Sequence, residues 1–330
     1  MTDTISSDLE KGKRTDMIVL DFAKAFDKVN HSLLTHKLDH YGIRGETNSW
    51  IKDFLKDREQ AVVVDGSRSS PIHVRSGVPQ GSVLGPCLFL CYINDLPEMV
   101  SSDARLFADD TAIHRVIDSE EDQILLQKDL DALHEWEIKW DMSFHPDKCF
   151  VLVFDRSKEV IRPEYRLHGQ LLSQVSSTKY LGLTIQDDGK WTEHINNTTT
   201  KGNQLVGFLR RNLKIKNTDA KSQAYKMLVR PALEYASNVW GPSESTAIKK
   251  IEKVQSRAAR FAIGDHRTTS SVTRAAERGG QGLILQRGPG PRRGPMRIQA
   301  QKKGGGKGKK KENRGKRREK EEKEERNGKM

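Results

Sequence analysis

Three acidic residues stand where short apolar segments end. Asp21 closes the apolar run that begins at Met17, and Asp109 and Asp110 lie between two short segments with strand character. Carboxylates on neighbouring strands can converge on Mg²⁺, which prefers oxygen ligands and completes its shell with substrate phosphates. Two such ions about 4 Å apart stabilise the attacking and leaving oxygens of phosphoryl transfer. An isolated Asp-Asp pair is usually a turn, so the chemical interpretation depends on all three acids together.

The strands that must hold these acids follow from short apolar runs. The run Met17–Phe22 predicts a buried strand, and Arg105–Phe107 and Ala112–Val116 predict a hairpin with the acidic pair at its tip. Asp65–Gly66 is typical of a hairpin turn. The other predicted strands are Gln60–Val64, Ile72–Val74, Cys149–Phe154 and Tyr180–Ile185.

Helical spacing of apolar residues predicts the remaining elements. In the first part of the chain, helices are predicted over His31–Tyr41, Glu46–Lys56, Leu84–Leu96 and from an N-cap at Ser119 to Trp140. Three helical stretches follow, over Glu193–Leu213, Thr218–Trp240 and Glu244–Ile263. Pro231 is expected to kink or split the second of them. Mixed strands and helices followed by helices alone predict an α+β domain and then a helical one.

Three segments resemble, in order, motifs A, B and C of reverse transcriptases. They are LDFAKAFDKVNH (Leu20–His31), SGVPQGSVLGP (Ser76–Pro86) and FADD (Phe107–Asp110). FADD alone would be weak, but the three together, at suitable gaps, identify the non-LTR (LINE-like, jockey-like) retrotransposon family. The resemblance extends from about Met17 to Ser271. It implies a reverse-transcriptase palm, with a ferredoxin- or RRM-like antiparallel sheet and helices, followed by a helical thumb.

The resemblance implies roles for the acids and for one lysine. Asp21 matches the metal ligand of motif A, although Asp27 in the same segment is a rival for that role. Asp109 and Asp110 match the pair of motif C, and the three would hold two Mg²⁺ ions, with Mn²⁺ as a substitute. Lys148, in FHPDKC, resembles the motif D lysine, which would be catalytic by giving a proton to the pyrophosphate leaving group.

Further positions match nucleotide and primer contacts. Phe26 matches an aromatic steric gate, where a ring against the sugar excludes a 2′-hydroxyl; a core phenylalanine is the alternative. Gln80 and Gly81 match the Pro-Gln-Gly loop beside the incoming nucleotide. KYLGLTI resembles motif E, the primer grip, through Tyr180, Leu181 and Gly182. The partners implied are an RNA template, a DNA primer and a dNTP.

The charge is concentrated at one end of the chain. The 330 residues carry a formal net charge of +12, and residues 287–330, with 18 Lys and Arg and six Glu, hold all of it. We expect a lead-in over 1–16, a palm over 17–189, a thumb-like region over 190–264 and a low-complexity, disordered basic tail over 265–330. Lys309–Arg318 could act as a nuclear localisation signal or a nucleic-acid-binding patch.

Several classes of protein are disfavoured. The three cysteines are unpatterned and no Cys/His cluster has zinc spacing, so an intracellular, reducing location in nucleus or cytoplasm is expected. No apolar run approaches the length of a membrane span.

Two departures from the family leave the activity open. Only 20 residues precede Asp21, where the family has a fingers region, and the resemblance stops near Arg267–Thr273. We therefore expect a fragment truncated at both ends. One hypothesis is an RNA-directed DNA polymerase, and the other is an inactive remnant that at most binds nucleic acid.

Overall fold

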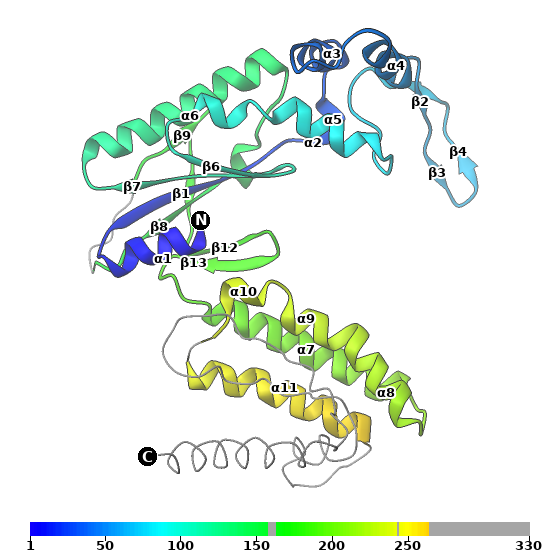
Figure 1. Cartoon of the computed structure of the whole chain (residues 1–330), viewed down its shortest axis with the longest axis vertical. Coiled ribbons are helices and arrows are strands. Elements are labelled where there is room, and N and C mark those ends of the chain that lie inside the picture. The colour runs from blue at the N-terminus through cyan, green and yellow to red at the C-terminus, as the bar shows by residue number, and fades with distance from the viewer. Residues whose placement is uncertain (158–162, 243, 264–330) are drawn as a thin grey trace, which may run out of the picture. The chain divides into compact units, whose positions relative to one another are not determined.

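The computed structural model describes residues 1–157, 163–242 and 244–263. The chain divides into two compact units, one of Met1–Lys201 with Pro242–Lys250, the other of Gly202–Gly241 with the chain from Ile251 (Figure 1). The first unit mixes a central sheet with helices and the second is helical, which confirms the predicted α+β class. The disordered tail predicted over 265–330, with its basic cluster, lies outside the described residues.

A five-stranded sheet forms the centre of the first unit, in the order β11-β8-β1-β7-β6. The strands are β1 (Arg14–Asp21), β6 (Asp103–Phe107), β7 (Asp110–Ile117), β8 (Phe150–Phe154) and β11 (Ser173–Gln174). The middle strand β1 pairs antiparallel with both β7 and β8, as the family resemblance implied. The edge strand β11 runs parallel to β8, so the sheet is not antiparallel throughout.

Within β1, Met17–Leu20 is an uninterrupted apolar run because both faces of the sheet are covered. Ile18 and Leu20 belong to the core shared with the helices of one face, whereas Met17 and Val19 belong to a second core on the other face. The first face carries α2 (Ala25–Lys28), α3 (His31–His40), α4 (Gly45–Leu55), α5 (Leu84–Ile93) and α6 (Glu120–Trp140). The second carries α1 (Thr2–Glu10) and the hairpin of β12 (Ser177–Tyr180) and β13 (Leu183–Gln186).

The N-terminal segment differs from the expected lead-in. Residues 2–10 form α1, and β1 already begins at Arg14. Ile5 and Leu9, four residues apart, are the buried side chains of this helix and pack into the second core. Two apolar residues are too few to produce a visible helical period, which is why the sequence pattern missed the element.

One of two hairpins in the first unit was predicted from the sequence, and the other was not. The predicted hairpin around Asp65–Gly66 is confirmed as two paired tiers: β2 (Glu59–Gln60) with β5 (Ile72–His73), and β3 (Val63–Val64) with β4 (Ser67–Arg68). The single strand predicted over Tyr180–Ile185 is wrong, because Leu181 and Gly182 have φ of 48° and 78° and turn the chain between β12 and β13. Residues in the left-handed region end a strand.

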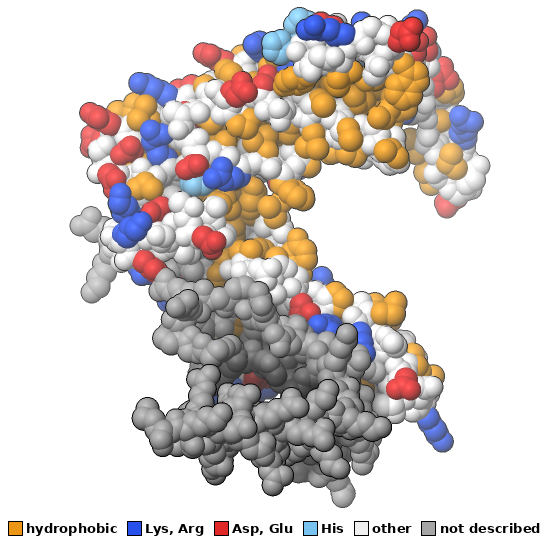
Figure 2. All heavy atoms as spheres, in the orientation of Figure 1, with side chains coloured by type: hydrophobic (Ala, Val, Ile, Leu, Met, Phe, Trp, Pro, Cys, Tyr) orange, Lys and Arg blue, Asp and Glu red, His pale blue; other side chains and the backbone are white. Residues whose placement is uncertain are grey.

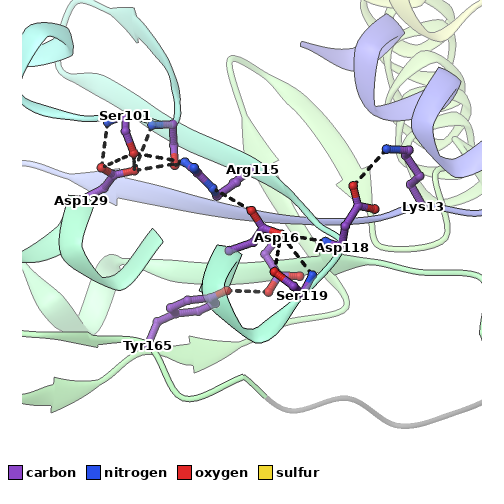
Figure 3. Close-up of polar contacts among 10 residues, drawn as sticks. Lys13, Asp16, Ser101, Arg115, Asp118, Ser119, Asp129 and Tyr165 are labelled. Carbon is purple, nitrogen blue, oxygen red and sulfur yellow. Dashed lines mark hydrogen bonds and ion pairs between the residues drawn. The ribbon is translucent and has the colours of Figure 1, made fainter. Parts of the chain in front are cut away.

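A buried carboxylate fixes the loop that leads into β6 (Figure 3). Asp129 on α6 accepts the backbone N–H groups of Ser101 and Ser102 at 2.8 and 2.9 Å. Arg115 on β7 lies 3.9 Å from the same carboxylate. The helix itself begins with the predicted cap at Ser119, which forms a reciprocal capping box with Asp122. These contacts hold α6 against the β6–β7 hairpin.

The second unit packs its helices around one apolar core. From Gly202 it contains the end of α7 (Thr192–Asn212), then α8 (Thr218–Ala224), a π-helical turn η3 (Tyr225–Val229), α9 (Arg230–Glu234), α10 (Ser237–Trp240) and most of α11 (Ser245–Ile263). The core consists of Val206, Leu209, Tyr225, Val229, Leu233, Val254, Ala258 and Phe261. The π-helical turn ends two residues before Pro231, whose ring clashes with the carbonyl four residues earlier, so the predicted splitting of this helix is confirmed.

The surface of the first unit exposes large apolar side chains. Figure 2 shows hydrophobic side chains gathered over α3, α4 and α5, and Trp50, Val83 and Leu90 are among the exposed ones. Within the described part of the chain, no helix combines the length and apolarity needed to cross a membrane.

Candidate active site

The β1–β7 pairing brings two of the predicted acids together. Its register places Asp21, the last residue of β1, opposite Asp110, the first residue of β7. Asp109 precedes Asp110 in the two-residue turn that follows Phe107 on β6. Ala108 completes the turn with a φ of 52°, a conformation that costs an L-residue about 1 kcal/mol. The sheet thus places Asp21, Asp109 and Asp110 together where β1 and β6 end and β7 begins.

Charge accumulates where these acids meet. The pKa of Asp110 is raised, first by desolvation and then by the negative charges of Asp109 and Asp21. A carboxyl group whose neighbours repel its charge is stabilised by a cation. The three groups offer oxygen donors only, the ligand type that Mg²⁺ and Mn²⁺ prefer.

Lys148 lies beside Asp21. Its Nζ is 3.3 Å from Asp21 Oδ2, and both side chains are open to solvent. Lys148 ends the short 3₁₀ turn η2 (Pro146–Lys148), and the backbone around it is tied to the end of β1. His145 N–H donates to Asp21 O at 2.8 Å, and Asp21 N–H approaches Cys149 Sγ at 3.5 Å. Burial raises the pKa of the Cys149 thiol to about 11, so it remains a neutral packing group.

The loop of the second motif, Ser76–Pro86, packs against α2. A Cβ on Gly77 would lie 2.8 Å from the Asp27 Cα, and a Cβ on Gly85 would lie 2.4 Å from the Pro79 carbonyl oxygen. These two glycines are therefore required by the chain's own close packing. Gly81 has open space at the Cβ position, so its backbone is accessible to a ligand.

Asp27, the rival of Asp21, belongs to this loop contact. Its Oδ1 accepts a hydrogen bond from Gln80 Nε2 at 3.0 Å, and its backbone carbonyl accepts one from Ser76 Oγ at 2.9 Å. Gln80 is exposed, so its amide can exchange this partner for a ligand. The structure therefore separates the two acids of motif A: Asp21 faces Asp110, and Asp27 holds the Gln80 side chain.

Phe26 is half-buried on α2. Its ring stacks on Phe89 of α5 with centroids 4.4 Å apart, and its carbonyl accepts the Val78 N–H at 2.8 Å. One part of the ring thus packs against the core while the rest stays accessible. This position is compatible with both interpretations of Phe26, as a core residue and as a gate.

The three primer-grip candidates occupy the β12–β13 hairpin. Tyr180 is buried, and its pKa is raised by desolvation and by the charge of Asp110. The hairpin therefore lies within electrostatic reach of the acids. Leu181 and Gly182 form its turn, with Leu181 packed against the second core.

One cluster of ligating side chains was missed by the sequence analysis. Among the described residues, one group of His, Cys, Asp or Glu side chains has three ligand atoms within 4.8 Å of one another: His134, Glu137 and His168. The three aspartates of the β1–β7 strand ends do not meet this distance. The sequence signal of the cluster was limited to a His and a Glu three residues apart on α6, since His168 joins them only through folding.

A family model for reverse transcriptase (RNA-dependent DNA polymerase) matches residues 2–185. The matched range contains every acid described above, together with Lys148 and the β12–β13 turn. It also includes α1, the helix that the sequence pattern did not predict.

Curated relatives come from mobile elements. An RNA-directed DNA polymerase from mobile element jockey of Drosophila funebris is 32% identical over 280 residues, covering 78% of this chain and 29% of the relative. A probable RNA-directed DNA polymerase from transposon BS of Drosophila melanogaster is 32% identical over 265 residues, covering 74% and 28%. The chain thus spans less than a third of these relatives.

Solved structures with a similar backbone include telomerases. That of Candida tropicalis, in complex with a TWJ fragment of telomeric RNA, has a TM-score of 0.48 at 12% identity and covers 84% of this chain and 43% of that one. That of Candida albicans has a TM-score of 0.37, also at 12% identity.

Proposed function

The chain belongs to the reverse transcriptase (RNA-dependent DNA polymerase) family, and from that premise we propose that it forms the catalytic palm of a non-LTR retrotransposon polymerase. The reaction is nucleotidyl transfer, in which the 3′-hydroxyl of a DNA primer on an RNA template attacks the α-phosphate of a dNTP. The observation that carries the proposal is the cross-strand pairing of Asp21 with Asp110, beside Asp109 in the turn.

The three aspartates would hold two divalent cations, Mg²⁺ or Mn²⁺. The fit rests on their oxygen-only donor set and on the raised pKa of Asp110, which has two causes: desolvation first, and then repulsion by Asp109 and Asp21 that cations would relieve. When bound, the ions supply charge stabilisation at the attacking and leaving oxygens. Asp21 and Asp110 lie at the ends of paired strands, so the sheet rather than a free loop positions their carboxylates.

The neighbouring side chains take supporting roles in this proposal. Lys148 is held near Asp21 by the η2 turn, and its protonated amine can donate to the departing pyrophosphate. Gln80 and the open Gly81 backbone offer hydrogen bonds to the incoming nucleotide. The β12–β13 turn, near the charge of Asp110, is suited to hold the primer end.

The proposal is tested by primer extension. The purified full chain is incubated with an RNA template, an annealed DNA primer, dNTPs and Mg²⁺, and incorporation is measured. Template-dependent extension supports the polymerase assignment. Salt-sensitive binding of the template–primer without any incorporation contradicts it and favours the remnant that only binds nucleic acid.

Replacing Phe26 by valine is expected to relax sugar selectivity. The smaller side chain removes the steric exclusion of the 2′-hydroxyl, so the preference for dNTP over rNTP should fall by a factor on the order of 10². The measurement is kcat/KM for a matched dNTP and rNTP pair. Phe208→Val, at an exposed position of α7, is the control and should leave the ratio unchanged. An unchanged ratio in Phe26→Val would assign Phe26 to the core alone.

A further inference from the structure

We propose that His134, Glu137 and His168 form a second metal site, which binds a divalent ion such as Zn²⁺ or Co²⁺. Their ligand atoms lie within 4.8 Å of one another. Glu137 Oε2 is 2.6 Å from His168 Nε2 and 3.3 Å from His134 Nδ1. One carboxylate oxygen and two imidazole nitrogens are the ligand set of open zinc sites, in which water takes the fourth position.

The carboxylate of this cluster is prepared for a cation. The Glu137 side chain is only 3% exposed, so its charge is costly unless a partner offsets it. Glu137 Oε1 accepts the backbone N–H of Phe144, which orients the group and leaves Oε2 facing the two histidines. Hydrogen bonds from the surrounding protein to metal-ligating carboxylates orient these groups in the same way.

The two histidines reach the carboxylate from different elements. His134 and Glu137 are three residues apart on α6, so both project from the same side of the helix. His168 lies in the turn of the small hairpin β9 (Arg166–Leu167) and β10 (Gln170–Leu171), where its φ is 53°. The two imidazole rings lie with their centroids 4.5 Å apart.

The hairpin that carries His168 is fixed to α6 independently of the cluster. Gln127 donates its Nε2 to the Arg166 carbonyl at 2.9 Å and accepts the Arg166 N–H at 2.8 Å. This two-point contact fixes the β9–β10 hairpin to α6 at Gln127, seven residues before His134. The third ligand is therefore pre-positioned, which lowers the entropic cost of closing the site around an ion.

The ligand chemistry separates this site from the aspartate site. Imidazole nitrogen suits Zn²⁺, Co²⁺ and related ions, whereas Mg²⁺ favours oxygen ligands. The aspartates sit at the β1–β7 strand ends, and this cluster joins α6 to the β9–β10 turn. The two sites should therefore fill with different metals.

The test is a titration of the full chain with Co²⁺, monitored by the visible d–d absorption of the bound cobalt. Excess Mg²⁺ is present to occupy oxygen-only sites. We expect one equivalent to bind with the spectrum of a four-coordinate ion, and Zn²⁺ to displace it. His134→Asn, at a partly exposed position, should weaken binding at least tenfold. The double variant Asp109→Asn/Asp110→Asn should bind Co²⁺ as the parent does.

Two further variants keep the test decisive. His36→Asn, exposed on α3 and outside the cluster, is the matched control and should bind as the parent does. His168→Asn, on the hairpin, should reproduce the loss seen in His134→Asn and also abolish the rise in melting temperature that Zn²⁺ causes in the parent. Equal Co²⁺ affinity in the parent and in His134→Asn, or no stoichiometric binding by the parent, would overturn the proposal.

Discussion

Replacing Asp109 and Asp110 together by asparagine is expected to abolish primer extension while leaving the fold intact. The change removes two negative charges at the end of the β1–β7 pair but preserves side-chain size. Loss of the ligands that stabilise transition-state charge should lower kcat by about 10³-fold or more. Incorporation of a labelled dNTP on an RNA template in Mg²⁺ measures the effect.

The same variant should unfold no more readily than the parent. Desolvation and the charges of Asp109 and Asp21 raise the pKa of Asp110, so removing charge relieves repulsion in the folded state. Activity lost without loss of stability distinguishes a metal-site role from a structural one. Asp103→Asn, exposed on β6 and paired with Arg105, is the control and should retain activity. A double variant within tenfold of the parental rate would contradict the site assignment.

Asp129→Ala, on α6, is expected to cause a large loss of stability for a single polar substitution. The carboxylate, whose side chain is 6% exposed, accepts the N–H groups of Ser101 and Ser102 and lies near Arg115 (Figure 3). Alanine leaves two donors and a partly buried guanidinium without this acceptor. The free energy of unfolding should fall by about 3 kcal/mol. Urea unfolding followed by circular dichroism measures it.

The control for this prediction lies on the same helix. Asp131 is exposed on α6 and accepts one hydrogen bond from Gln127 at 2.9 Å. Asp131→Ala should therefore change the free energy of unfolding by less than about 1 kcal/mol. Because the Ser101–Ser102 loop leads into β6, the Asp129 variant should also lower activity by loosening the strand before Asp109. Equal stability of the two variants would show that the buried network contributes little.

Local patterns were sufficient wherever one short segment contained the whole signal. The apolar run of β1 predicts a strand buried on both faces, and the acidic pair between two apolar segments predicts a hairpin tip. The pattern failed at α1, which buries only Ile5 and Leu9, and at the β12–β13 turn, where Leu181 adopts a left-handed φ of 48°. In both cases tertiary packing outweighed the intrinsic preference of the segment.

By itself, the sequence determined the family, the order of the motifs and the identity of the acids, because these depend on residue type and spacing along the chain. Only the tertiary structure decided that Asp21 rather than Asp27 faces Asp110, that Lys148 lies 3.3 Å from Asp21, and that His168 joins two residues of α6. Those relations join segments far apart in the sequence. They are set by strand register and by burial against distant elements, which no local period contains.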